Sequence, residues 1–119
     1  MINNNFNDFK LEYERETKSC GKSILNTRIW DDCVRIDARQ YEDHIYLYWI
    51  TSYPTFHAGN GARCMTWLCS LADKYELPIK LQPTPMSDTL SEDKLVEFYE
   101  KFGFYQEYPG ATLMIRNNR

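Results

Sequence analysis

The sequence predicts a mixed α/β domain with a largely antiparallel sheet, and a change of pattern along the chain supports this prediction. In the first half, apolar and polar residues alternate with a period of two, which is typical of half-buried β-strands. After Gly59 the apolar residues recur every third or fourth position, which is typical of one face of a helix. Strands are expected on both sides of this helix, so the middle of the chain requires a parallel strand pair joined by a crossover.

The chain has 119 residues, which predicts a single domain spanning residues 1–119. Residues 1–8 are rich in Asn and have no periodicity, so we expect this end to fray. The net charge of −3 argues against a nucleic-acid partner held by bulk charge, because neutralising phosphates requires a basic face.

Two features of the sequence predict a cytoplasmic protein with no membrane partner. The longest apolar run, from Ile45 to Ile50, is far shorter than the roughly 20 residues of a membrane helix. The N-terminus also lacks the apolar core of a secretory signal.

The cysteines are too few and too irregularly spaced for a disulfide framework, and no CxxC or Cys/His spacing indicates zinc. We therefore expect reduced thiols that pack as small hydrophobic side chains, and no bound metal. The cysteines are Cys20, Cys33, Cys64 and Cys69.

Three strands are predicted in the first half of the chain. Phe9, Leu11 and Tyr13 alternate with charged residues and predict a first strand, whereas residues 16–26 fit either a loop or a short strand. The alternation at 34–38 and the β-branched and aromatic residues at 45–52 predict an antiparallel hairpin.

Two main helices are predicted in the second half. The first begins near Gly59 and ends before Pro78, and residues 79–81 then form a strand. Its buried face is predicted to hold Met65, Leu68, either Leu71 or Ala72, and Tyr75.

The second helix has clear signals at both ends. Ser91 is a good N-cap, Leu90 and Leu95 occupy the positions of a hydrophobic staple, and Gly103 is a C-terminal cap. Its apolar stripe comprises Leu95, Phe98, Tyr99 and Phe102. Two strands, at 104–108 and 112–115, are expected around a Pro-Gly turn.

A candidate anion site lies where the first of these helices begins. Glycines and small residues at a helix N-terminus let a phosphate approach backbone N–H groups that have no partner inside the helix. The residues concerned are Gly59, Asn60, Gly61, Ala62 and Arg63. A permissive turn that merely starts a helix is the alternative. Cys64 stands where the third glycine of a dinucleotide-binding fingerprint would be, so that fingerprint is incomplete.

Two motifs together resemble the GNAT superfamily of acetyl-CoA-dependent N-acetyltransferases, over residues 43–116. Gly59 and Gly61 match the glycines of the family's Q/R-x-x-G-x-G/A motif, and the segment FYEKFGF matches its Tyr-containing helix end, with Tyr99 in the key place. The Gln/Arg position of the first motif falls on Phe56; a shifted register would place His57 there instead.

The resemblance implies a GNAT-like fold, acetyl-CoA as co-substrate, and direct attack of an amine on the thioester. It implies that the strand through Ile50, Thr51 and Ser52 offers backbone groups to the pantetheine arm and to the thioester carbonyl. It also implies that the amides of residues 59–63 hold the pyrophosphate, and that Tyr99 assists the leaving thiolate.

Several points stay open at this level. Asp37, Glu42 and His44 are alternative bases for the amine, and the acceptor is either a small molecule or a protein. Many relatives in the family are dimers, so a homodimer is also left open. The alternative function is a catalytically weak acyl-CoA-binding or protein-interaction module on the same scaffold, and a structural domain without a ligand is a third.

Overall fold

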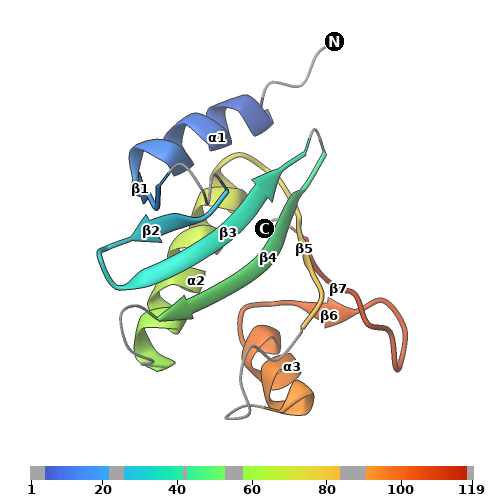
Figure 1. Cartoon of the computed structure of the whole chain (residues 1–119). Helices are drawn as coiled ribbons and strands as arrows, with labels where there is room; N and C mark the ends of the chain where they lie inside the picture. The colour runs from blue at the N-terminus through green and yellow to red at the C-terminus, as the bar shows by residue number, and fades with distance from the viewer. Residues whose placement is uncertain (1–4, 22–25, 42, 53–57, 84–90, 118–119) are drawn as a thin grey trace.

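The computed structural model describes residues 5–21, 26–41, 43–52, 58–83 and 91–117. In these ranges a seven-stranded sheet carries three helices (Figure 1). The strand order is β1-β2-β3-β4-β5-β7-β6. The β4–β5 pair is parallel and the other neighbouring strands are antiparallel. The predicted fold class, a mixed α/β domain with a mostly antiparallel sheet, is therefore confirmed.

Helix α1 (Asn5–Arg15) replaces the strand that was expected to begin at Phe9. Phe9 and Tyr13 are buried, whereas Leu11 is 65% exposed. Residues four apart share one face of a helix, and residues two apart do not. The strand prediction is wrong because Phe9 and Tyr13 fit both periods, and only packing against the rest of the chain decides between them. Residues 5–8 are helical rather than frayed, and residues 1–4 lie outside the described ranges.

Strands β1 (Thr17–Ser19) and β2 (Arg28–Trp30) extend the sheet beyond the predicted hairpin. The first lies within the segment left open as a loop or strand, and the second was not predicted, because its three residues are all half-buried and show no alternation. Asp31 and Asp32 form the turn after β2 with φ of 52° and 55°. Positive φ at both central residues is typical of a type I′ turn, which the Cys33 N–H closes by donating to the Trp30 carbonyl at 3.1 Å; Cys33 is the third residue of the connection to β3.

Strands β3 (Val34–Gln40) and β4 (Ile45–Ser52) form the antiparallel hairpin that the sequence predicts. The register shifts between Asp37, which faces Trp49, and Ala38, which faces Leu47. Tyr48 is therefore an extra residue on β4, as in a β-bulge.

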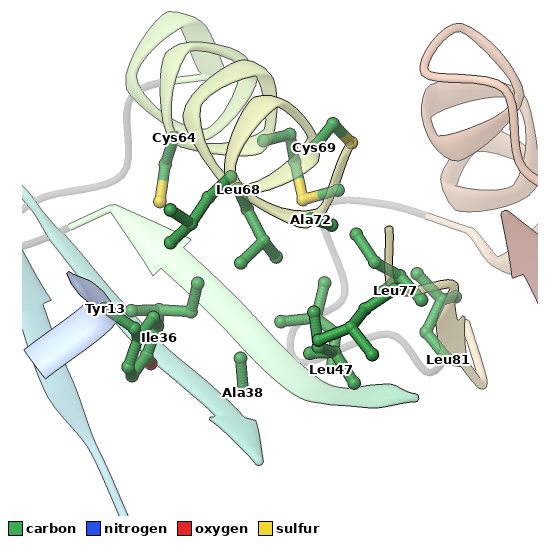
Figure 2. Close-up of a cluster of buried hydrophobic side chains, with 14 of the residues drawn as sticks. Tyr13, Ile36, Ala38, Leu47, Cys64, Leu68, Cys69, Ala72, Leu77 and Leu81 are labelled. Carbon is green, nitrogen blue, oxygen red and sulfur yellow. The ribbon is translucent and has the colours of Figure 1, made fainter. Parts of the chain in front are cut away.

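Helix α2 (Ala58–Lys74) lies behind β3 and β4 in Figure 1 and supplies the main layer over the sheet. Its predicted buried face is confirmed for Met65, Leu68, Leu71 and Ala72, which are all buried, whereas Tyr75 lies just beyond the helix and is half-buried. Figure 2 shows this helix and the sheet facing each other across the core through Cys64, Leu68, Cys69, Ala72, Ile36, Ala38 and Leu47. Strand β5 (Ile79–Leu81) follows as predicted.

Helix α3 (Glu92–Glu100) has the predicted ends. The Ser91 side chain accepts a hydrogen bond from the Lys94 N–H at 3.3 Å, as an N-cap does. Gly103 has φ of 94° and donates to the Glu100 carbonyl, while the Phe104 N–H donates to the Tyr99 carbonyl. This pair of bonds is a Schellman motif. The predicted staple partner Leu90 lies outside the described residues.

The last two strands are shorter than predicted. They are β6 (Tyr105–Gln106) and β7 (Met114–Arg116). Arg116 in β7 ties the end of α2 to the end of α3, because its guanidinium donates to the Asp73 carboxylate and to the Phe102 carbonyl.

Helix α1 is joined to α2 through a carboxylate. Glu12 accepts hydrogen bonds from Lys74 Nζ at 2.7 Å and from the Tyr75 hydroxyl at 2.6 Å. Both bonds lower the pKa of Glu12 below its usual 4.5, and the bond from Lys74 has the larger effect. A carboxyl whose pKa is lowered by folding stabilises the folded state above its unfolded pKa, and this stability is lost as the pH falls through the folded pKa.

Replacing Glu12 by Gln should therefore lower the free energy of unfolding at pH 7 by about 1 kcal/mol. The deficit relative to wild type should shrink as the pH falls below about 4.5, because the wild-type carboxyl then becomes protonated. Urea denaturation at pH 7 and at pH 3 measures both values. Glu14→Gln, at an exposed position of the same helix, is the control. An equal deficit at the two pH values would contradict the assigned role of the carboxylate.

Candidate functional site

The parallel strands β4 and β5 separate part-way along β4. They pair only between residues 45–47 and 79–81, and the last pair is Leu47 with Leu81. Strand β4 then continues through Ile50 and Thr51 to Ser52, still paired with β3 on its other side. Among the described residues, no strand pairs with this part of β4 on the β5 side. Backbone groups that point toward β5 there are therefore available to another partner.

Helix α2 begins a few residues after this separated part of β4. Gly59 is exposed, and Asn60 and Gly61 are half-exposed. Because the helix starts at Ala58, the N–H groups without a partner inside it belong to its first turn. This start favours Gly59 and Asn60 over Ala62 and Arg63 as backbone donors. Phe56 and His57, the two alternatives for the Gln/Arg position, lie outside the described residues.

Packing against the described part of the chain does not require a glycine at position 61. Outside its own helix, no heavy atom of the described residues would lie within 4 Å of a Cβ atom built on Gly61, and the φ of Gly61 is not in the left-handed region. Glycine inside a helix costs about 1 kcal/mol relative to Ala. The space beside Gly61 is open, so the residue fits a position that a ligand approaches closely.

The Arg63 side chain is held by the turn between β2 and β3. Its guanidinium pairs with the Asp31 carboxylate, donates to Asn60 Oδ1 at 3.2 Å, and lies 5.2 Å from the Trp30 ring centre. These contacts keep the cation beside the first turns of α2. The resemblance assigns Arg63 only a backbone N–H group. The structure shows that its side chain is also fixed near the start of α2.

Tyr99 projects from α3 into a group of aromatic rings. It is 7% exposed, and the rings of Phe98 and Phe104 meet it edge-on with centroids at 5.2 Å and 5.7 Å. Burial raises the pKa of Tyr99 to about 12. The phenol therefore stays protonated near pH 7 and can act there as a hydrogen-bond donor.

Asp37 forms a charged cluster that the sequence did not predict. The pattern places Asp37 on the polar side of a half-buried strand, yet it is only 5% exposed. Both of its oxygens accept from Arg39, at 3.2 Å and 3.4 Å, and the Arg39 guanidinium lies 4.2 Å from the centre of the Tyr48 ring. One signal in the sequence could have indicated this cluster: Asp37 and Arg39 lie two residues apart in a strand, so their side chains share one face.

The three alternative bases differ in how they are placed. A ring nitrogen of His44 lies 2.7 Å from an Asp43 carboxylate oxygen, and its ring stacks on that of Tyr41, so one nitrogen and one ring face are already occupied. Glu42 lies outside the described residues. Asp37 is buried beneath Arg39 rather than open to solvent.

Neither a metal centre nor a membrane span is found in the part of the chain that the structure describes. No group of three or more His, Cys, Asp or Glu side chains there could hold a metal ion. No helix in that part is long and apolar enough to cross a membrane.

Two solved structures resemble the chain. The anti-CRISPR protein AcrVA5 is 25% identical with a TM-score of 0.63, over 73% of this chain and 93% of that one. A putative GNAT-family acetyltransferase from Bacteroides thetaiotaomicron is 19% identical with a TM-score of 0.55, over 96% of this chain and 79% of that one. The chain has a GNAT fold. The expected resemblance to the GNAT superfamily is thereby confirmed at the level of the fold. No protein-family model and no curated protein sequence matches the chain.

Proposed function

We propose that the chain is an N-acetyltransferase that moves the acetyl group of acetyl-CoA directly to an amine. The observation that carries this proposal is the separation of β4 from β5 after Leu47, directly before the open N-terminus of α2. Within the described residues, both features leave backbone donors without a strand or helix partner, one set on β4 and one at the start of α2, and a thioester arm and its pyrophosphate require two such sets. The GNAT fold of the two similar structures supports the assignment.

The backbone does most of the binding in this proposal. Gly59 and Asn60 donate N–H groups to the pyrophosphate, aided by the positive end of the helix dipole, and Gly61 leaves room for it. Ile50, Thr51 and Ser52 offer the free backbone groups of β4 to the pantetheine arm. An N–H of β4 at the point of separation donates to the thioester carbonyl, and so stabilises negative charge on that oxygen during the attack.

Tyr99 assists the departing sulfur as a hydrogen-bond donor. A free thiol has a pKa of about 8.5, so complete transfer of the proton from a phenol near 12 would be uphill by about 5 kcal/mol. Tyr99 therefore stabilises the developing thiolate by donating its hydrogen bond and keeps its proton until the product leaves. The acceptor amine loses its proton to water or to a base that the substrate brings near.

Acetyl-CoA should raise the melting temperature of the purified protein. A ligand at 100 times its Kd that binds only the folded state adds about 2.7 kcal/mol, which corresponds to roughly 10 °C for a domain of this size. Differential scanning fluorimetry with acetyl-CoA, and with pantetheine as a control that lacks the phosphates, measures this. No shift with millimolar acetyl-CoA would overturn the proposal.

Thiol release separates the proposal from its alternative. An acetyltransferase releases free coenzyme A in the presence of a suitable amine, and a thiol reagent detects it. An acyl-CoA-binding module would show the thermal shift without release across a broad panel of amines and proteins.

A further inference from the structure

A row of side chains crosses three neighbouring strands on the sheet face opposite α2. Arg39 on β3 faces Tyr46 on β4, and Tyr46 faces Lys80 on β5. Paired residues in adjacent strands point to the same side of a sheet. Ile45 and Leu47, the neighbours of Tyr46 along β4, are buried in the core, so this row points the other way.

Arg39 is held in one position in this row. The Asp37 carboxylate accepts from its Nε and Nη2 atoms, and the Tyr48 ring lies under the guanidinium at 4.2 Å. The hydrogen bond from Arg39 to Asp37 also raises the pKa of Arg39, so the group stays charged. The Arg39 side chain is nevertheless 41% exposed. The guanidinium is therefore fixed by Asp37 and Tyr48 and is still accessible to solvent. It is preorganised to bind an anion, since less side-chain entropy is lost on binding.

The row lies beside the point where β4 and β5 separate. Tyr46 and Lys80 belong to the last paired stretch, one residue before Leu47 and Leu81. Tyr48, under Arg39, is the extra residue of the bulge that immediately follows. In the proposed function, this is where the thioester carbonyl lies.

We propose that Arg39 and Lys80 bind an anionic group, a carboxylate or a phosphate, carried by the acceptor close to its amine. This inference rests on the proposed acetyltransferase function. Two strand spacings of about 4.8 Å separate the Cα atoms of Arg39 and Lys80 by roughly 9.5 Å, a span that two long side chains can bridge over Tyr46. Arg39 supplies planar donors for such an anion, Lys80 adds a second charge, and the amine is left near the thioester.

Matched pairs of acceptors test the proposal. β-Alanine is compared with β-alaninamide, and O-phosphoethanolamine with ethanolamine, by kcat/KM for thiol release. The anionic member of at least one pair should be preferred by tenfold or more, and the pair that shows it identifies carboxylate or phosphate. A preference ratio near one in both pairs would overturn the proposal.

Charge-removing variants locate the preference. Lys80→Gln should reduce the ratio at least threefold. Arg39→Gln alone would strand the buried Asp37 charge, so the double variant Asp37→Asn with Arg39→Gln is used, and it should bring the ratio close to one. Lys18→Gln is the control. It should keep the wild-type ratio, because the Lys18 cation lies on β1 and pairs with Asp32. An unchanged ratio in both test variants would show that the anion binds elsewhere.

A binding measurement without acetyl-CoA separates this inference from the proposed function. O-Phosphoethanolamine and β-alanine are titrated into the protein while the Arg39 Nε–H resonance is followed by NMR, with Arg39→Lys used for assignment. A saturable shift without thiol release for any amine would keep the anion site and overturn the acetyltransferase. Thiol release without an NMR shift and without a preference for the anionic acceptors would keep the acetyltransferase and overturn the anion site.

Discussion

Replacing Tyr99 by Phe should lower kcat for acetyl transfer by about 100-fold, while the Kd for acetyl-CoA stays within about twofold of wild type. The hydroxyl is expected to act only when negative charge develops on sulfur, so its loss affects the transition state more than the bound substrate. The ring remains and keeps its contacts with Phe98 and Phe104, so the fold should be retained.

Single-turnover kinetics and calorimetric titration measure these two constants. Tyr108→Phe removes a hydroxyl from a residue that is 64% exposed and is the matched control. An unchanged kcat in Tyr99→Phe would remove Tyr99 from the mechanism, and a raised Kd with unchanged kcat would assign it to cofactor binding instead.

The pH profile gives a second check on Tyr99. With a pKa of about 12, more than 90% of the phenol stays protonated below about pH 11. The rate should therefore show no loss that depends on Tyr99 up to the highest pH at which the protein stays folded. A descending limb near pH 10 that disappears in Tyr99→Phe would show that the phenol is not buried as described.

Replacing Gly61 by Val should abolish the thermal stabilisation by acetyl-CoA, which corresponds to a loss of at least 100-fold in affinity. The branched side chain would fill the open space beside the first turn of α2, where the proposed pyrophosphate lies. The apo protein should remain folded, since a Cβ at this position meets no heavy atom of the described residues outside its own helix within 4 Å.

Gly61→Ala makes the outcome unambiguous. Alanine favours a helix over glycine by about 1 kcal/mol, so the apo protein should melt at a higher temperature. Its single methyl group should weaken acetyl-CoA binding less than Val does. A higher apo melting temperature together with a lower affinity for acetyl-CoA is expected only if the ligand binds beside Gly61. Normal affinity in Gly61→Val would show that the pyrophosphate binds elsewhere.

Local signals in the sequence determined the second half of the fold. Ser91, Gly103 and Pro78 act through hydrogen bonds and φ restrictions within a few residues, so their effects do not depend on the rest of the chain. The helix of residues 58–74 was predicted because its apolar spacing fits only one period. For the same reason, the glycines at the start of α2 can be recognised as a candidate anion site from their immediate neighbours in the sequence.

The tertiary structure alone decided helix α1, strand β2 and the charged cluster. Phe9 and Tyr13 satisfy two periodicities, and their contact with α2, where Tyr13 stacks on Trp67, selects the helix. Asp37 is buried because Arg39 and the bulge at Tyr48 surround it, and the bulge is a property of how two strands pair. Lys80 lies in the same row across the sheet as Arg39 only because β4 pairs with β3 on one side and with β5 on the other, since the two residues are far apart in the chain. Short-range backbone chemistry can be inferred from neighbouring residues, whereas burial and the meeting of charges depend on which strands become adjacent.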